Sequence, residues 1–477
     1  MIDLYTRWLE NYESVPRCLA SLQDVETVIS VFNANIDAVR KINPGLFSEL
    51  LQKVGSPFAG GETPNEIASS RDLLRGFLEC FESGIAQEWL ITDQETYRWL
   101  DENVGYDQLQ MGGQGGIIAN VMAVCGIRNV LVHAASLPNQ QSKLFVDADN
   151  LLSVASDGRF RKACTIHRED DNPLIHWILE FNSGDTICVD GREITCPKSN
   201  RFIATWDPLN FRLAIDENFA RAMESYARGL DYCMLSGYQM LSEDLADGGK
   251  AIDRIRASKA LVDRWRQGQE RLIVHFEFAS TQDRVVRRQL YEEMSHWADS
   301  MGLNEQELID ILEVTDQDQL AAACQGSISA DTLFPGLLWV FENSGIPRIQ
   351  LHFFGLYITL QKKGFRHTPR QTRDGMALAA TIAAAKACTG SIENQEDLLA
   401  AAGQRIGEVS ARELCALASH LEARFGPGDL RETGILETEE FDVVALPTII
   451  VKNPLTLVGM GDTISSLSLV GASRTRD

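Results

Sequence analysis

Short apolar runs alternate with longer amphipathic stretches along most of the chain. The runs are about four to eight residues long, and many of the stretches between them repeat apolar residues at helical spacing. Strands that alternate with helices predict an α/β domain with a mainly parallel sheet between helical layers. The predicted strands are Thr27–Phe32, Val130–Ala134, Ile175–Phe181, Tyr232–Leu235, Leu272–Phe278, Ile349–Phe354 and Val443–Leu446, and the clearest helical stretches are Ala251–Arg266, Arg287–Met301 and Arg373–Cys388.

Two regions depart from this alternation. Residues 40–110 are polar, and residues 150–205 contain short apolar runs separated by turn signals such as Asp157-Gly158. Because the two regions flank a single βα unit, we expect them to combine in space into a smaller, β-rich lid domain. The larger, discontinuous domain would then consist of residues 1–39, 111–149 and 206–477.

Composition narrows the class of protein. The 477 residues are 44% hydrophobic and 23% charged, as in globular proteins that contain two or three domains. The net charge of −23 makes a nucleic acid or an anionic membrane an improbable partner. We expect a cytoplasmic protein, because the N-terminus is charged and no apolar run reaches about 18 residues. The ten cysteines contain no C-x-x-C pair and are expected to be reduced thiols.

A glycine-rich turn near the C-terminus is the first candidate for chemistry. Gly459-Met460-Gly461-Asp462 precedes residues 463–472, which can form a helix. Glycines let bare backbone amides approach an anion at the positive end of a helix. Asp462 would be placed there to accept a proton from a hydroxyl group that attacks phosphorus. Taken alone, the motif also fits an ordinary turn.

A second glycine-rich segment, Gly112–Gly116, leads into a predicted helix at residues 117–125. Its glycines, Gly113 among them, would let the backbone approach a ligand. The amide of Gln114 offers both a donor and an acceptor, which suits sugar hydroxyls. A flexible loop between a strand and a helix is the structural alternative.

Polar residues also follow the first predicted strand. Asn33-Ala-Asn35-Ile-Asp37 lies where ligands of open α/β sheets bind, beyond the carboxyl ends of the strands. Asn35 and Asp37 could hold two hydroxyls of one sugar. An Asx-turn at the end of the strand is the alternative.

Two acidic residues could organise a metal ion. Glu277 ends a predicted strand on the same face as His275, and Asn304 and Glu307 would share a face of a helix. Carboxylates from separate segments that meet near phosphates suit a Mg²⁺ ion held largely through water. An ordinary strand end and a capped helix start are the alternatives.

Taken together, these segments resemble the ADP-dependent sugar kinases of archaea, a branch of the ribokinase-like superfamily. The resemblance covers nearly the whole chain, and its most specific part runs from Pro447 to Ser466. It implies an α/β fold with a ribokinase-like three-layer core that binds the nucleotide, a smaller β-rich lid, magnesium, and transfer of the β-phosphoryl group of ADP to a sugar. The other matching segments are Asn33–Asp37, Gly112–Asn120, His176–Phe181, Asn200–Ile203, Leu235–Gln239, His275–Ser280 and Gly302–Glu307.

The resemblance also implies roles for individual residues. Asp462 would be the catalytic base, and the amides of Gly459, Met460 and Gly461 would form the anion hole. Arg201 would clamp the phosphates, and His352 would form a wall of the nucleotide site. The implied magnesium site consists of Glu277, Glu307 and Asp462, and the implied sugar contacts are Asn35, Asp37, Glu88, Gly113, Gln114 and His176.

Glu88 bears on the choice between glucokinase and phosphofructokinase, because both occur in this family. It stands where glucokinase-type members carry a glutamate that accepts hydrogen bonds from glucose, and a carboxylate there would repel a second phosphate. Phosphofructokinase-type members have basic residues at the places that hold Ser183 and Asp207 in this chain. His176 also follows the glucokinase pattern. We therefore expect an ADP-dependent glucokinase that converts glucose and MgADP into glucose 6-phosphate and AMP.

Three alternatives stay open. The first is an ADP-dependent 6-phosphofructokinase, or a bifunctional enzyme, in which other basic residues of the lid hold the sugar phosphate. The second is a non-catalytic sugar-binding regulator on the same fold, which the intact Asp462, glycine loop and acidic residues disfavour. The third is an ATP-using ribokinase-type enzyme, which the extent of the resemblance disfavours. The expected partners are the small molecules glucose and ADP, and the expected assembly is a monomer or a small homo-oligomer.

Overall fold

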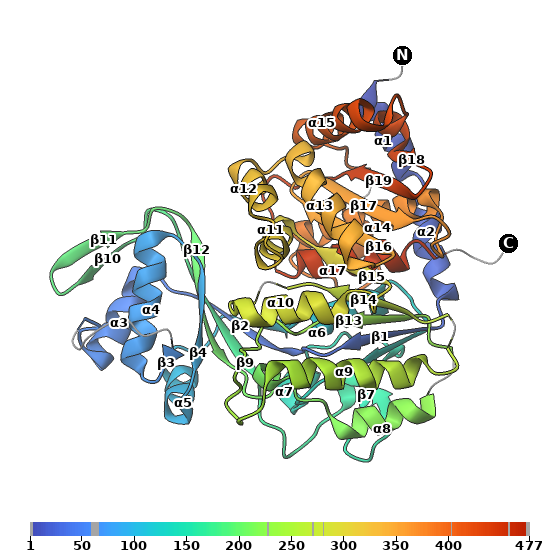
Figure 1. Cartoon of the computed structure of the whole chain (residues 1–477). Helices are drawn as coiled ribbons and strands as arrows, with labels where there is room; N and C mark the ends of the chain where they lie inside the picture. The colour runs from blue at the N-terminus through green and yellow to red at the C-terminus, as the bar shows by residue number, and fades with distance from the viewer. Residues whose placement is uncertain are drawn as a thin grey trace.

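The structure is a computed structural model that contains two separate sheets. It describes residues 3–58, 66–226, 229–269, 271–279, 281–401, 403–456 and 458–473. Within these residues, the strands form an 11-stranded sheet, a 6-stranded sheet and a two-stranded hairpin. The smaller sheet and its helices project from one side of the larger domain, at the left of Figure 1.

The large sheet has a parallel centre with antiparallel strands at its edges. In chain order its strands are β1 (Thr27–Val31), β6 (Asn129–Val132), β7 (Leu151–Val154), β8 (Phe160–Lys162), β13 (Tyr232–Leu235), β14 (Ile273–Glu277), β15 (Ser300–Leu303), β16 (Arg348–Phe353), β17 (Leu356–Lys362), β18 (Ile435–Glu437) and β19 (Phe441–Pro447). Their order across the sheet is β18-β19-β17-β16-β15-β14-β13-β1-β6-β7-β8. Strands β1, β13, β14 and β16 are buried along their whole length. Burial on both faces fits the continuous apolar run of β13, whereas β14 and β16 also bury polar residues such as His275 and Gln350.

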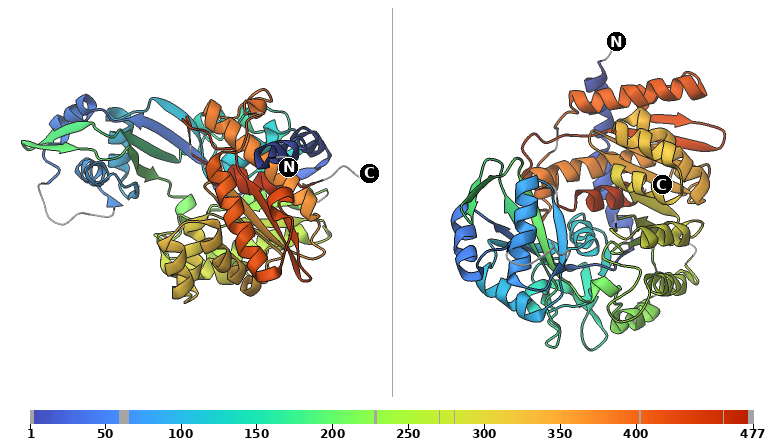
Figure 2. Two further views of the ribbon diagram at one scale, coloured as in Figure 1. Left: turned by 90° about the horizontal axis from the view of Figure 1, so that it is seen from above. Right: turned by 60° about the vertical axis from the view of Figure 1, so that its left-hand side comes forward.

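The smaller sheet forms the lid. In chain order its strands are β2 (Asn35–Lys41), β3 (Glu66–Ile67), β4 (Gln87–Ile91), β5 (Gln108–Gly112), β9 (Ile175–Phe181) and β12 (Asn200–Trp206), its helices are α3 (Pro44–Val54), α4 (Ser70–Ser83) and α5 (Gln94–Asn103), and its hairpin is β10 (Thr186–Val189) with β11 (Arg192–Thr195). A separate hydrophobic core that includes Phe47, Phe77 and Trp177 holds the lid together. Figure 2 shows from two further directions that the lid extends beyond the large sheet.

Helices cover both faces of the large sheet. They are α1 (Leu4–Tyr12), α2 (Val15–Ser21), α6 (Gln114–Val124), α7 (Asn139–Ser142), α8 (Glu217–Tyr226), α9 (Ala251–Arg266), α10 (Arg284–Met294), α11 (Glu305–Val314), α12 (Asp318–Gly326), α13 (Ala330–Ser344), α14 (Pro369–Thr389), α15 (Glu408–Phe425), α16 (Leu430–Thr433) and α17 (Met460–Val470), with 3₁₀ turns at Leu22–Asp24, Ala163–Thr165, Asn210–Arg212 and Asp397–Leu399. The right-handed crossovers from β13 to β16 place α9, α10 and α11 on one face. The crossover from β1 to β6 runs in the opposite direction and places α6 on the other face, where α17 packs on both α6 and α14.

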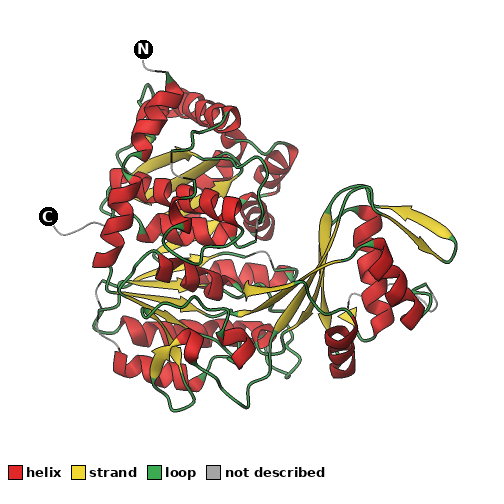
Figure 3. Cartoon of the chain, turned by 180° about the vertical axis from the view of Figure 1, so that it is seen from behind, coloured by secondary structure: helices red, strands yellow, loops and turns green. Residues whose placement is uncertain are grey.

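This arrangement confirms the predicted three-layer α/β core with a smaller β-rich lid. Figure 3 shows the helices on both sides of the strands. Of the described helices, none combines the length and the apolar character needed to cross a membrane.

The structure moves two of the expected boundaries. Strand β2 begins at Asn35, so the first lid segment starts a few residues before residue 40, and residues 59–65 of that segment lie outside the described residues. Strands β7 and β8 pair next to β6 in the large sheet, although residues 150–205 were expected in the lid. The second lid segment therefore starts near β9. Short strands with turns look alike in sequence, whichever sheet they join.

One predicted helix was too long. Arg287–Met301 was expected to be continuous, but α10 ends at Met294, and Ser300–Leu303 form the parallel strand β15. His296 between them has a φ of 59°, which no helix accommodates. Apolar residues in the turn and the strand happened to continue the helical spacing.

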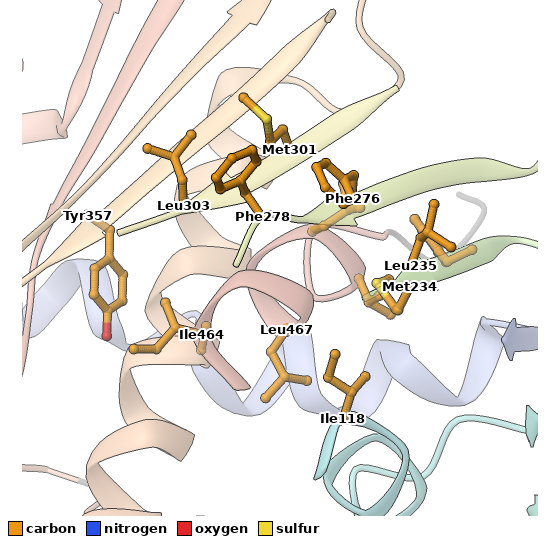
Figure 4. Close-up of a cluster of buried hydrophobic side chains, with 14 of the residues drawn as sticks. Ile118, Met234, Leu235, Phe276, Phe278, Met301, Leu303, Tyr357, Ile464 and Leu467 are labelled. Carbon is orange, nitrogen blue, oxygen red and sulfur yellow. The ribbon is translucent and has the colours of Figure 1, made fainter. Parts of the chain in front are cut away.

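Apolar packing fixes the start of α17 over the sheet. Ile464 and Leu467 of α17 belong to the same buried cluster as Met234, Phe276 and Ile118 (Figure 4). The helix also contacts strands β14, β15 and β16. The glycine loop at its N-terminus is thereby held near the carboxyl ends of the parallel strands, where α/β sheets bind ligands.

Candidate active site

The glycine loop needs its two glycines for different reasons. Gly459 is the N-cap of α17 with a φ of 62°, and a Cβ there would come 2.7 Å from the Cδ1 of Ile117. A Cβ on Gly461 would come 2.8 Å from the Nε2 of His352. The loop therefore combines a left-handed turn with a close approach to a neighbouring strand. The first amides of the helix have no acceptor within the helix and are suited to an anion.

Asp462 lies in the first turn of α17 and contacts the second glycine segment. The Nε2 of Gln114 donates a hydrogen bond to its Oδ1 at 2.9 Å, and the backbone N–H of Gly237 donates to the Oε1 of Gln114 at 3.0 Å. Burial raises the pKa of Asp462, while the Gln114 hydrogen bond and the positive charge of Lys386 act in the opposite direction. Gln114, a predicted sugar contact, therefore orients the proposed base in this structure.

Asn35 and Asp37 stand at the start of β2, beside the second glycine segment. The Nδ2 of Asn35 donates to the Oδ1 of Asp37 at 2.9 Å, and both side chains are buried. Gly113 has a φ of 74°, and a Cβ there would lie 2.7 Å from the Oδ1 of Asn35. Within the described part of the chain, that Oδ1 and both amide atoms of Asn33 have no hydrogen-bond partner. Buried polar atoms without partners are costly, so a ligand rich in hydroxyls would satisfy them.

His176 and Glu88 extend this polar surface across the lid sheet. The strand registers place Asp37, His176 and Thr205 side by side on β2, β9 and β12. The hydroxyl of Thr205 donates to the Oε1 of Glu88 at 2.6 Å. The structure therefore brings Asp37, Glu88 and His176 together on one face, as expected of a sugar site.

Glu277 and Glu307 approach the glycine loop from the other side. Burial raises the pKa of Glu277 well above its ordinary value, and the negative charges of Asp462 and Glu307 raise it further. A Cβ on Gly302 would lie 2.4 Å from the Oε2 of Glu277, so β15 has no room for a side chain at position 302. Glu277 therefore lies close enough to Asp462 and to Glu307 to be repelled by both.

Glu307 also has a structural role. Its Oε2 accepts a hydrogen bond from the backbone N–H of Asn304 at 2.8 Å, and Asn304 caps α11 in return. The sequence had suggested that Asn304 and Glu307 share a face of one helix. In the structure Asn304 instead precedes the helix as its N-cap. In the described segments no group of three or more His, Cys, Asp or Glu side chains is arranged to hold a metal ion directly.

His352 lines a cavity of about 700 Å³ on the far side of the glycine loop. Tyr357, Met460 and Gly461 also line it, together with residues 448–452. Burial lowers the pKa of His352 to about 4, so the ring is neutral near pH 7. The cavity is of a size that accommodates a nucleotide-sized ligand.

Arg201 is the predicted site residue that the structure does not bring to the others. Arg201 pairs with Glu180, whereas Thr205 pairs with His176. Arg201 therefore lies four residues before Thr205 on β12. At about 3.3 Å per residue of a β-strand, Arg201 lies roughly 13 Å along the strand from Thr205. Among the described residues its guanidinium has no ion-pair partner. Arg201 shares the face of Thr205 and could reach the glycine loop only if the lid approached the large sheet.

Lys386 was missed by the sequence analysis. It is only 7% exposed, and its Nζ donates to the backbone oxygen of Gly459 at 3.4 Å. Burial lowers its pKa to about 8, although the charges of Asp462 and Asp37 favour the protonated form. A lysine within the alanine-rich run of residues 383–387 was the available signal, because a charge there interrupts a buried helix.

We expect a Gly461→Ala substitution to weaken the site without unfolding the protein. The added methyl would displace His352 or the start of α17, and such shifts lower kcat/KM for ADP by about tenfold or more. Steady-state kinetics and thermal unfolding would test this. Gly326→Ala is the matched control, because nothing lies within 4 Å of a Cβ at Gly326. Unchanged kinetics in Gly461→Ala would show that the close approach is not needed.

The fold and the site together define a class of enzyme. A nucleotide-sized cavity and a polar face with buried side-chain atoms that have no partner among the described residues lie at a helix N-terminus that carries an acidic residue, an arrangement that suits an α/β phosphotransferase. The chain belongs to the ADP-specific phosphofructokinase/glucokinase family, whose conserved region matches residues 26–471. It is therefore an ADP-dependent sugar kinase, and its substrates are a sugar and ADP.

Relatives of both specificities are similar to this chain. The ADP-specific phosphofructokinase of Methanosarcina acetivorans is 26% identical over 94% of each chain. The ADP-dependent glucose/glucosamine kinase of Pyrococcus abyssi is 30% identical over 97% of this chain and 98% of its own. Among solved structures, the last common ancestor of the Methanosarcinales ADP-dependent phosphofructokinases is 28% identical, with a TM-score of 0.87 over the whole of both chains. An ADP-dependent kinase in complex with fructose 6-phosphate and ADPβS is 27% identical, with a TM-score of 0.83 over 98% of each chain.

Proposed function

We propose that this kinase transfers the β-phosphoryl group of ADP to the 6-hydroxyl of glucose. The observation that carries the proposal is the acidic character of the sugar-facing part of the lid. Asp37 and Glu88 lie beside His176 on this face and Asp207 lies behind its ring, so His176 is the one basic side chain among these four. A sugar that already carries a phosphate dianion would be repelled there, whereas neutral hydroxyls would find several acceptors.

The positions that are basic in phosphofructokinase-type relatives support the same proposal. Asp207 is completely buried behind His176, and Ser183 lies in an exposed turn after β9. The backbone N–H of Ser183 donates to the Oγ of Ser199 at 2.8 Å. Neither residue offers a positive charge to a sugar phosphate.

In the mechanism that follows from this proposal, Asp462 accepts the proton of the 6-hydroxyl as the oxygen attacks the β-phosphorus. Gln114 holds the carboxylate in place from one side. The amides at the start of α17 and the guanidinium of Arg201 stabilise the charge that develops on the transferred group. Closure of the lid excludes water, which would otherwise compete with the sugar.

The acidic residues fit a magnesium ion. The negative charges of Asp462 and Glu307 raise the pKa of Glu277, and a divalent cation would relieve that repulsion. Because the carboxylates are not arranged as direct ligands, they would hold Mg²⁺ largely through its water shell. When bound, the ion would neutralise charge on the diphosphate.

Phosphofructokinase activity is the second candidate, because several relatives carry that name. Lys41 and Arg201 lie at the far end of the lid face, opposite Glu180 on β9. A sugar phosphate that reached this end of the sheet would find positive charge there.

A coupled assay that monitors AMP or sugar phosphate would separate the two. Purified protein would be supplied with MgADP or MgATP, and with glucose or fructose 6-phosphate. Turnover of glucose with ADP is the expected result. A strong preference for fructose 6-phosphate would overturn the glucose assignment and point to Lys41 and Arg201.

Glu88→Gln is expected to lower kcat/KM for glucose by about 10- to 100-fold, because a charged hydrogen-bond acceptor is lost. The loss should fall mainly on KM, since Glu88 lies in the lid and not at the glycine loop. Glu49→Gln is the matched control, because Glu49 is an exposed glutamate on helix α3 of the lid. Equal kinetics in the two variants would remove Glu88 from the sugar site.

A further inference from the structure

His176 is held by a carboxylate on the side away from the sugar-facing groups. Its Nε2 lies 3.1 Å from the Oδ2 of Asp207, within hydrogen-bond distance. Its Nδ1 lies 3.9 Å from the Oε1 of Glu88, which is too long for a direct hydrogen bond. The Nε2 of the ring is therefore engaged by Asp207, whereas its Nδ1 makes no direct hydrogen bond with Glu88.

Asp207 is fixed at the point where the lid returns to the large domain. It follows the last residue of β12 and is completely buried. The backbone N–H of Asn210 donates to its Oδ1 at 3.0 Å, and the Nδ2 of Asn210 donates to its Oδ2 at 2.7 Å. These bonds hold the carboxylate in a single orientation, with His176 as its remaining partner.

The charged groups that face His176 are all acidic. They come from three different strands or strand ends: Asp37 on β2, Glu88 on β4 and Asp207 after β12. Burial alone would lower the pKa of His176, but the hydrogen bond and charge of Asp207, with the charges of Glu88 and Asp37, raise it to about 9.

We propose that Asp207 is a positioning residue that keeps His176 doubly protonated, so that its Nδ1–H donates a hydrogen bond to a hydroxyl of the bound sugar. The proposal rests on the proposed function, because it takes the surface of Asp37, Glu88 and His176 as the sugar site. Asp207 does not touch the sugar itself. It orients the ring and supplies the charge that makes Nδ1 a donor, while Asp37 and Glu88 act as acceptors.

The proposal fixes a direction for the pH dependence. The pKa of His176 in the fold, about 9, lies above the value of about 6.5 for an exposed histidine. The protonated ring therefore contributes fully to stability below about pH 6.5, and this contribution is lost as the pH rises through 9. Sugar affinity should fall over the same alkaline range, because Nδ1 stops donating.

The test is an NMR titration of the histidine rings in the full-length protein, with the His176 signal assigned through His176→Gln. In the wild type, His176 is expected to stay protonated until about pH 9. In Asp207→Asn its pKa should fall by more than about one unit, and KM for the sugar should rise by about tenfold with a smaller change in kcat. Asp442→Asn is the matched control, because Asp442 is a buried carboxylate on β19 of the large sheet.

The wild-type titration needs no variant, so poor folding of Asp207→Asn would not leave the proposal untested. A wild-type His176 that loses its proton below about pH 6.5 overturns the role of Asp207, whichever sugar is the substrate. A high pKa that Asp207→Asn does not lower also overturns it. If His176 behaves as expected but the enzyme prefers fructose 6-phosphate, the Asp207 role is supported and the glucose assignment fails.

Discussion

Replacing Asp462 with asparagine is expected to lower kcat by at least about 100-fold, the usual size of a general-base effect. Asparagine keeps the shape of the side chain, and its oxygen can still accept the hydrogen bond from Gln114. It cannot accept a proton from the attacking hydroxyl. KM for the sugar should change much less, because most of the proposed sugar contacts lie in the lid and in the Gly113 segment.

The measurement is steady-state and single-turnover kinetics, with circular dichroism as a check on folding. Asp283→Asn is the matched control, because Asp283 also lies at the start of a helix, caps α10, and can be replaced by another good capping residue. A turnover number for Asp462→Asn near that of the wild type would show that another group accepts the proton.

Replacing Arg201 with glutamine is expected to lower kcat by about 100- to 1,000-fold, the effect of losing one preorganised donor to a developing charge. Arg201 lies far along β12, so it can act only after the lid approaches the glycine loop. Its loss should therefore leave binding of the sugar to the open lid almost unchanged. ADP affinity should fall if the guanidinium contacts the phosphates after the lid has closed, as the proposed mechanism requires.

Kinetics and small-angle scattering would test this prediction together. The wild type should become more compact when the sugar and a non-transferable ADP analogue bind together, and Arg201→Gln should lose part of this change. Arg192→Gln is the control, because Arg192 is an exposed arginine of the lid hairpin that pairs with Glu82. Wild-type turnover and compaction in Arg201→Gln would assign the clamp to a different residue.

The core of the fold could be predicted because strands that are buried on both faces consist mostly of apolar residues. The predicted strands at Ile175–Phe181 and Tyr232–Leu235 and the helix at Ala251–Arg266 have the same bounds in the structure. β15 was lost inside a predicted helix, because four buried residues after a turn can imitate helical spacing. The assignment of β7 and β8 failed for another reason, since only their partners decide which sheet they join.

The candidate active site could likewise be predicted only in part. Glycine segments and strand-end polar residues were visible as patterns, and the structure brings Asp462, Gln114, Asn35, Asp37, Glu88 and His176 into two neighbouring groups. Lys386 and the pairing of Asp207 with His176 were not visible. Both depend on contacts between residues far apart in the chain, and a single buried lysine or aspartate has no periodicity that marks it.

The way the lid is attached affects how the protein folds. Val28 of β1 pairs with Tyr232 of β13, and Asp37 of β2 pairs with His176 of β9, so both sheets join distant parts of the chain. The chain passes between the domains at both ends of each lid segment, and neither sheet can close before long stretches of backbone have been ordered. Such non-local pairing slows folding. We therefore expect refolding to be slow, with partly paired strands exposed to aggregation, and a ligand that binds both domains should favour the completed fold.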